Sequence, residues 1–270
     1  MRVRKRHVLA LLVGAMLAVS VPFARAEIEP YAYCPFRVSF DCSFPPLAFQ
    51  VDGEPLPKTL PKRVMAPIAV AVRGKIVSSD GSQPPALREV VVDLDKNAEI
   101  NAAAFPACGL RRIEGRGAAE VHSACRDAIV GKGRALIGVG SSERGSLEVP
   151  LTLVNGGVAG GMTRLFVHGE IPAPEPVAIV SVAKVEKARK GRYGHTTTWR
   201  IPPILDGAGS LLEFNFQLKG GYVSAKCADG KLQANMIKAL FRNEGEGPKT
   251  STTLKGTVIR PCTQGPASES

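Results

Sequence analysis

The chain has 270 residues, of which 44% are hydrophobic and 22% are charged. This length and composition can bury a sizeable core, as one large domain or at most two, and they exclude disorder as the general state of the chain. The formal net charge of +11 falls to +6 once the five basic residues Arg2, Arg4, Lys5, Arg6 and Arg25 are left out, because 30 basic residues then face 24 acidic ones. Such an excess is ordinary for a soluble protein and gives no ground for specific nucleic-acid recognition.

Those five residues belong to a segment with the three parts of a secretory signal peptide. Residues 1–7 are basic, residues 8–21 form an apolar run too short to span a bilayer comfortably, and Ala24-Arg25-Ala26 is a small-x-small cleavage site. We therefore expect residues 1–26 to be a signal peptide and the mature chain to be secreted. An uncleaved N-terminal anchor at the cell surface is the alternative. No later stretch is apolar enough for a transmembrane span.

The cysteines all lie beyond this cleavage site. An even number of cysteines in an exported chain predicts a disulfide framework, and pairing between nearest neighbours is the simplest of its connectivities. No C-x-x-C motif and no paired ligand spacing accompanies them, so neither redox nor metal chemistry is expected. The expected pairs are Cys34 with Cys42, Cys108 with Cys125, and Cys227 with Cys262.

The mature chain divides by composition. Residues 27–66 are rich in proline and aromatic residues and are expected to be an irregular lead-in, residues 67–262 to be the main domain, and residues 263–270 to be a flexible tail. Within the main domain, short β-branched segments separated by glycine and proline clusters predict strands. They are residues 68–72, 90–94, 135–139, 147–154, 162–168, 177–185, 196–201, 211–218, 221–226, 232–242 and 252–259. One helix is expected at residues 117–128, where Val121, Ala124, Cys125 and Ala128 share a face.

The stretch of residues 191–218 shows the strand pattern most clearly. Leu212, Phe214, Phe216 and Leu218 occupy every second position, which is typical of a strand with one buried face. Residues 196–201 precede them and contain the single tryptophan, Trp199. We expect the two segments to pair as a hairpin across the Pro202-Pro203 connection.

Short strands at this spacing, with few helices between them, favour an all-β fold with antiparallel pairing. An antiparallel β-sandwich with one short helix is the leading expectation. A β-barrel is the alternative.

Short motifs of glycine, proline and cysteine recur between about residue 67 and Cys262. They are Asp80-Gly81 before Pro84-Pro85-Ala86-Leu87, Phe105-Pro106-Ala107-Cys108, Cys125 followed by Val130-Gly131-Lys132-Gly133, Gly191-Arg192-Tyr193-Gly194, Ile201-Pro202-Pro203-Ile204, Gly207-Ala208-Gly209-Ser210-Leu211, and Ala225-Lys226-Cys227-Ala228-Asp229-Gly230. This arrangement resembles a family of uncharacterised exported bacterial proteins. The resemblance implies a β-rich architecture with paired cysteines and export, and no assigned activity.

Several local patterns suggest a chemistry that the sequence does not complete. Asp93-x-Asp95-x-Asn97 begins like an EF-hand calcium loop, but alanine stands where the loop needs its glycine and its bidentate glutamate. Gly131-Lys132-Gly133 lacks the rest of a P-loop and is interpreted as a turn. A G-x-S-x-G elbow is missing, which leaves a hydrolase only as a spatially assembled site. No cofactor or metal is expected.

The run from Lys184 to Arg192 is the strongest local charge. A basic cluster here could hold an anionic envelope component, although a solvated hairpin tip is the preferred interpretation. The residues are Lys184, Lys187, Arg189, Lys190 and Arg192.

Two functions remain open. The leading one is a non-enzymatic exported domain that binds a ligand or contributes to the cell surface. The alternative is a secreted hydrolase, which requires at least two of His122, His168 and His195 to meet an acidic residue in one pocket.

Overall fold

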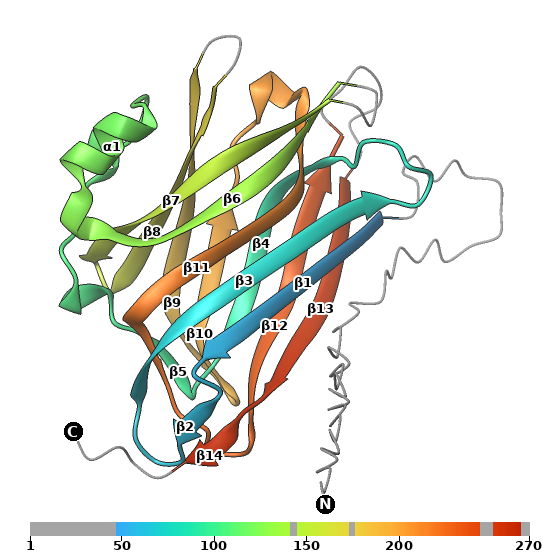
Figure 1. Cartoon of the computed structure of the whole chain (residues 1–270). Helices are drawn as coiled ribbons and strands as arrows, with labels where there is room; N and C mark the ends of the chain where they lie inside the picture. Colours follow the sequence, from blue (N-terminus) through green and yellow to red (C-terminus); the bar gives the residue numbers. More distant parts are fainter. Residues whose placement is uncertain (1–46, 141–144, 173–175, 244–250, 266–270) are drawn as a thin grey trace, which may run out of the picture.

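The computed structural model describes residues 47–140, 145–172, 176–243 and 251–265. The expected signal peptide and the expected pair of Cys34 with Cys42 lie outside the described residues. Most of the described chain forms one large sheet that curls into a nearly closed barrel (Figure 1).

Within the described residues, strands predominate, with a single α-helix and four short 3-10 helices between them. The elements are β1 (Leu47–Leu56), β2 (Thr59–Pro61), β3 (Ala66–Ser78), β4 (Ala86–Asp95), β5 (Ala98–Ile100), η1 (Ala102–Ala104), η2 (Leu110–Arg112), α1 (Ala118–Ala124), η3 (Arg126–Ala128), β6 (Ile129–Val139), β7 (Ser146–Ala159), β8 (Met162–Ile171), β9 (Val177–Lys190), β10 (Tyr193–Arg200), η4 (Leu205–Gly207), β11 (Gly209–Ala225), β12 (Lys231–Arg242), β13 (Ser251–Pro261) and β14 (Thr263–Gly265).

The main sheet follows one path around the barrel. Its order is β1-β3-β11-β6-β7-β8-β9-β10-β4-β12-β13, and β5 pairs with the end of β11. Every neighbouring pair on this path is antiparallel. The all-β prediction is therefore confirmed. The arrangement is the barrel alternative and not the two-sheet sandwich, because one continuous sheet curls until it is nearly closed.

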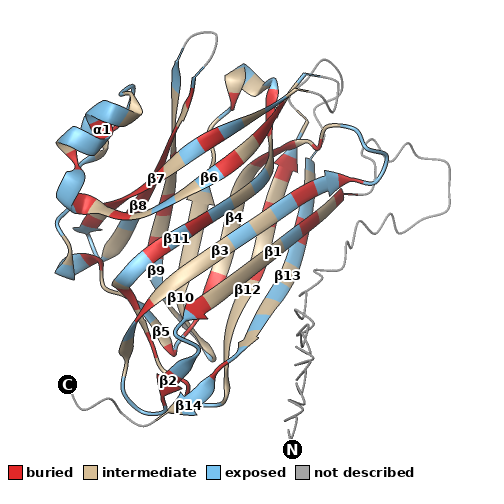
Figure 2. Cartoon of the chain, in the orientation of Figure 1, coloured by how far each residue is buried: buried red, intermediate tan, exposed pale blue. Residues whose placement is uncertain are grey.

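Buried and exposed side chains alternate along the strands, which gives the sheet one apolar face that the barrel encloses. Along β11, Phe216 and Leu218 are buried while Gln217 and Lys219 are exposed, as a strand with one face inside requires. Figure 2 shows the same change from buried to exposed residues along neighbouring strands. Because the inward face is apolar around the whole circuit, closing the sheet removes that face from water, which is the main driving force for folding.

The expected hairpin between residues 196–201 and 211–218 is wrong. The strand β10 pairs with β9 and β4, whereas β11 pairs with β3 and β6. Trp199 of β10 and Phe216 of β11 meet instead through their rings, whose centroids lie 5.7 Å apart. Their apolar faces attract each other across the barrel interior, and the Pro202-Pro203 connection leads from one wall to another.

Both ends of the main domain extend further than expected. The second half of the expected lead-in forms β1, which pairs with β3 over its whole length, and β2. In the expected tail, β14 pairs with β2 in parallel. Residues 221–226 are likewise no separate strand, since β11 continues through a bulge between Leu218 and Val223.

Gly131-Lys132-Gly133 is also not a turn, because it lies inside β6. A Cβ atom at Gly133 would come within 2.1 Å of the Asn215 carbonyl oxygen, and one at Gly131 within 2.4 Å of the Gln217 oxygen. The two glycines therefore permit the close approach of β6 to β11.

The expected helix is confirmed as α1. It belongs to an excursion, residues 102–128, that packs over the outer surface of the barrel and covers Val154 and Phe166. Asn155 of β7 ties the start of this excursion to the wall, because its side-chain amide donates hydrogen bonds to three backbone carbonyl oxygens at residues 102, 105 and 106. The disulfide between Cys108 and Cys125 then closes the excursion on itself.

A second disulfide, between Cys227 and Cys262, closes the end of the barrel where β2 and β14 lie. The backbone amide of Cys227 donates to the Pro61 carbonyl, and Leu60 is fully buried beside the pair. Both predicted pairs of the main domain are therefore confirmed. Two disulfides indicate that the folded chain belongs in a non-reducing environment.

The ends of the sheet meet at a seam between β1 and β13. Eleven strands lie on the path, and alternating directions over an odd number leave the two end strands parallel. No ladder joins β1 to β13 in the described residues. Side chains bridge them instead, since Arg260 of β13 donates to the Asp52 carboxylate of β1 with its Nε 2.7 Å from Oδ1. Arg73 of β3 holds the other carboxylate oxygen at 2.6 Å.

We predict that removing the Cys227–Cys262 disulfide costs more stability than removing Cys108–Cys125. The loops span 35 and 17 residues, and the loss of closure entropy corresponds to roughly 4 and 3 kcal/mol. The measurement is urea unfolding of the two Cys→Ser double variants, followed by Trp199 fluorescence. A variant without Cys227–Cys262 that is as stable as the variant without Cys108–Cys125, or more stable, would contradict it.

A second prediction concerns the seam. Burial alone would raise the pKa of Asp52, but the hydrogen bonds from Arg260 and Arg73 outweigh it and lower the pKa below its ordinary value of 3.8. A carboxyl whose pKa is lower when folded stabilises the fold above its unfolded pKa and loses that contribution as the pH falls through the folded pKa. Asp52→Asn should therefore cost about 1 kcal/mol at neutral pH and less in acid.

The test is urea unfolding of wild type and Asp52→Asn at about pH 7 and about pH 3. Glu54→Gln is the matched control, because Glu54 lies on the same strand and forms an ion pair with the exposed Lys58. A difference between wild type and Asp52→Asn that persists unchanged in acid would show that charge at the seam is not its cause.

Candidate functional site

The barrel contains an apolar cavity of about 220 Å³. Every strand on the path contributes to its wall, from Phe49 and Val51 of β1 to Val258 of β13. An engineered protein cavity of about 150 Å³ stays dry and admits benzene. At the volume per atom that the six carbons of benzene have there, a cavity of about 220 Å³ has room for roughly nine non-hydrogen atoms.

The wall carries no charged side chain among the described residues. Its one hydroxyl among the described residues belongs to Ser181, which donates to the Arg200 carbonyl oxygen at 3.0 Å and is thus already bonded within the protein. The sequence prediction missed this space. The available signal was the size of the inward residues, since small side chains such as Ala135, Val149 and Gly169 stand where a filled interior needs larger ones.

Aromatic rings line the middle of the cavity. Trp199 and Phe216 meet from opposite walls, and Phe214 stacks on Phe216 with ring centroids 6.1 Å apart. Phe49 of β1 reaches Phe214 and Phe241. Because Trp199 is the only tryptophan of the chain, its fluorescence reports directly on whatever occupies the cavity.

The connection after β10 contributes two further apolar side chains. Ile201 and Ile204 line the cavity, and Ile204 is buried. The next residue, Leu205, has a φ of 49°, in the left-handed region that a bulky side chain rarely adopts. Ser210, at the start of β11, holds the connection by donating to the Pro84 carbonyl oxygen at 2.6 Å. Contacts of neighbouring residues therefore hold the backbone of Leu205 in this strained conformation beside the cavity.

The histidines named by the hydrolase alternative do not lie in this cavity. His122 of α1 contacts the Thr152 hydroxyl at 3.1 Å, and the buried His168 contacts the Arg116 carbonyl oxygen at 2.8 Å. Thr152 and His168 are direct partners between β7 and β8, so two histidines do approach each other, beneath α1 on the outer surface. Their hydrogen bonds in the described structure go to a hydroxyl and a carbonyl, and not to a carboxylate.

The third histidine, His195, lies on β10 in the same every-second-position row as Trp199, which lines the cavity. Burial lowers its pKa, the nearby Lys187 lowers it further, and Glu99 opposes them. His195 therefore favours the neutral form at neutral pH.

The Asp93-x-Asp95-x-Asn97 pattern is used for hydrogen bonding within the fold. Asp93 accepts from the Thr196 hydroxyl at 2.5 Å. Asp95 accepts from the backbone amides of Asn97 and Gln233 at 2.9 and 3.1 Å. No group of three or more metal-binding side chains gathers within the described residues.

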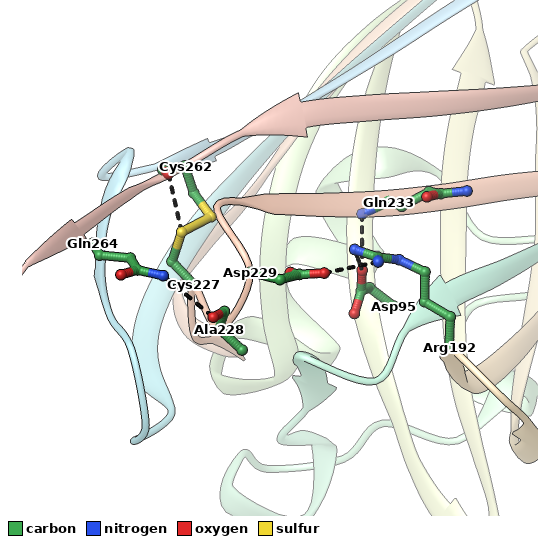
Figure 3. Close-up of a disulfide and its surroundings, with 8 residues drawn as sticks. All are labelled: Asp95, Arg192, Cys227, Ala228, Asp229, Gln233, Cys262 and Gln264. Atoms are coloured by element: carbon green, nitrogen blue, oxygen red, sulfur yellow. Dashed lines mark hydrogen bonds and ion pairs between the residues drawn. A yellow bond between two sulfur atoms is a disulfide. The ribbon is translucent and has the colours of Figure 1, made fainter.

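The remaining charge on Asp95 is matched by Arg192 (Figure 3). The Asp95 carboxylate is only 2% exposed and lies 3.0 Å from the Arg192 guanidinium, which also donates to Asp229 at 2.8 Å. This hydrogen bond lowers the pKa of Asp229 and raises that of Arg192. Two motifs that are far apart in sequence, around residues 192 and 229, thus meet beside the Cys227–Cys262 disulfide.

The other members of the basic run are placed differently. Lys187 is exposed, and Lys184 is partly buried beside Arg164 on the neighbouring strand. The side chains of Arg189 and Lys190 lie outside the described part of the structure. Binding of an anionic envelope component by this run stays a prediction, and Arg192 serves the fold in addition.

We predict that Arg192→Gln lowers the free energy of unfolding by roughly 3 kcal/mol, because it leaves the buried Asp95 carboxylate without a cation. Lys187→Gln is the matched control and should cost less than about 0.5 kcal/mol. Urea unfolding checks both. Adding Asp95→Asn to Arg192→Gln should recover part of the loss, and a double variant as unstable as the sum of the singles would refute the coupling.

None of the helices in the described part of the chain is long and apolar enough to cross a membrane. No protein-family profile, curated protein or solved structure matches the sequence or the fold significantly. The resemblance to uncharacterised exported bacterial proteins therefore stays a prediction.

Proposed function

We propose that this chain is an exported, non-enzymatic barrel that binds a small apolar molecule in its interior. The observation that carries the proposal is the cavity of about 220 Å³, whose wall is apolar around the complete circuit of strands. The signal peptide expected at residues 1–26 and the two disulfides support an extracellular place of action.

The size of the cavity sets the class of ligand and its affinity. Burial contributes about 0.8 kcal/mol for each methylene group, so a chain of about eight carbons gains roughly 6 kcal/mol. That free energy corresponds to a dissociation constant on the order of tens of micromolar. Medium-chain aliphatic molecules and compact ring compounds fit this range.

The hydrolase alternative has less support. Hydrolysis requires a nucleophile, a base and an orienting group in a place that the substrate reaches. Within the described residues the cavity wall contains no histidine and no acid, and His168 is covered by the excursion that carries α1.

We predict that 1-bromooctane quenches the fluorescence of Trp199, because its bromine enters the cavity that the indole lines. Titration of the protein should saturate with a dissociation constant of tens of micromolar. Ala135→Phe should weaken this binding at least tenfold, since a phenyl ring is the size of the benzene that fills a cavity of about 150 Å³.

Ala159→Phe is the matched control, because Ala159 lies exposed at the end of β7, the strand that pairs with the β6 strand of Ala135. Urea unfolding of both variants establishes that they are folded. Quenching that is linear and unsaturable in the wild type, or equal in both variants, would mean that the ligand stays outside the barrel.

A further inference from the structure

Two polar atoms at the inner surface of β10 have no hydrogen-bond partner. They are the hydroxyl oxygen of Thr197 and Nδ1 of His195, and both are buried. A buried polar atom without a partner is uncommon in folded proteins, because it has lost its bonds to water and gained none in return.

Both side chains belong to the row that leads into the cavity. Trp199 lines the cavity, and Thr197 and His195 follow at every second position on the same face of the strand. Opposite Thr197 lies Val92, which is part of the cavity wall. Thr197 therefore lies beside two residues of the cavity wall, one row beyond Trp199.

Cross-strand neighbours also connect His195 to the cavity wall. His195 faces Leu94 on β4, and Leu94 faces Ala234 on β12, which lines the cavity. Two hydrogen-bonding groups thus stand together at one end of a space that is otherwise apolar. One is a hydroxyl, which both donates and accepts, and the other is an imidazole with a free ring nitrogen.

From this placement we infer that the ligand is amphipathic. Its aliphatic part, of about eight carbons, occupies the cavity, and a terminal hydroxyl group hydrogen-bonds to Thr197 and His195. A full charge is disfavoured at this position, because burying an ion without a paired counter-charge costs far more than burying a hydroxyl. The expected ligand class is a medium-chain alcohol. This inference rests on the proposed function.

The experiment compares 1-octanol with nonane, which has the same number of non-hydrogen atoms and no hydroxyl. Both compete with 1-bromooctane, and recovery of Trp199 fluorescence measures their dissociation constants. Thr197→Val removes the hydroxyl and keeps the β-branched shape. We expect Thr197→Val to raise the dissociation constant of octanol roughly three- to tenfold, which corresponds to the loss of one hydrogen bond. The dissociation constant of nonane should stay unchanged.

Thr198→Val is the matched control, because Thr198 is the next residue on β10 and points to the opposite face of the strand. It should change the dissociation constant of neither ligand. His195→Leu provides a second variant and should also weaken octanol more than nonane, which keeps the inference testable if one variant does not fold.

The outcomes separate the two proposals. If 1-bromooctane binds but Thr197→Val and His195→Leu affect octanol and nonane equally, the inference is wrong and the apolar binding function stands. If neither 1-bromooctane, octanol nor nonane binds the wild type, the proposed function itself fails, and this inference with it.

Discussion

The contact of Arg260 with Asp52 joins the two ends of the sheet. An antiparallel path of eleven strands ends in two parallel strands. No ladder joins β1 to β13 in the part of the chain that the structure describes, and side chains connect them there instead. Asp52 accepts hydrogen bonds from Arg260 on one side of the seam and from Arg73 on the other. The bridge is charge-assisted and partly shielded from water, which makes it stronger than an exposed pair.

The interior on which the proposed function rests follows from this closure. Val51 of β1 and Val258 of β13 both belong to the cavity wall, so the two strands of the seam are also two sides of the binding space. If the ends of the sheet stood apart, water would reach the aromatic rings around Trp199. The seam thus converts a one-sided apolar sheet into an enclosed apolar volume.

The remaining polar and covalent features lie around this volume and stabilise its surroundings. The Cys108–Cys125 excursion covers the outer wall, and the Cys227–Cys262 disulfide closes one end beside the Arg192 network. Each buried charge in that network has a partner of opposite sign, as burial requires. Thr197 and His195 differ from this pattern, because each has a buried polar atom without a hydrogen-bond partner.

The sequence by itself determined the all-β fold class, the helix near residue 120 and the two disulfides of the main domain. These properties depend on local patterns, namely alternation of apolar residues, a shared helical face and an even number of cysteines with short separations. Only the tertiary structure decided that the sheet closes as a barrel, that β10 and β11 face each other across it instead of pairing, and that β1 belongs to it. Strand order is a matter of contacts distant in sequence, and alternation is the same whether a strand faces a second sheet or its own barrel interior.

The same distinction holds for the site. Trp199 and Phe216 are recognisable from sequence as inward residues, and Arg192 as a cation. The sequence contains no sign that Arg192 lies against Asp95, since this pairing joins the start of one strand to the end of another. For the cavity the sequence contains only half of what is needed, the small size of inward residues such as Ala135 and Gly169, because the volume also depends on the circumference set by eleven strands. The chain therefore specifies which residues face inward, and the closure of the sheet decides how much space they leave.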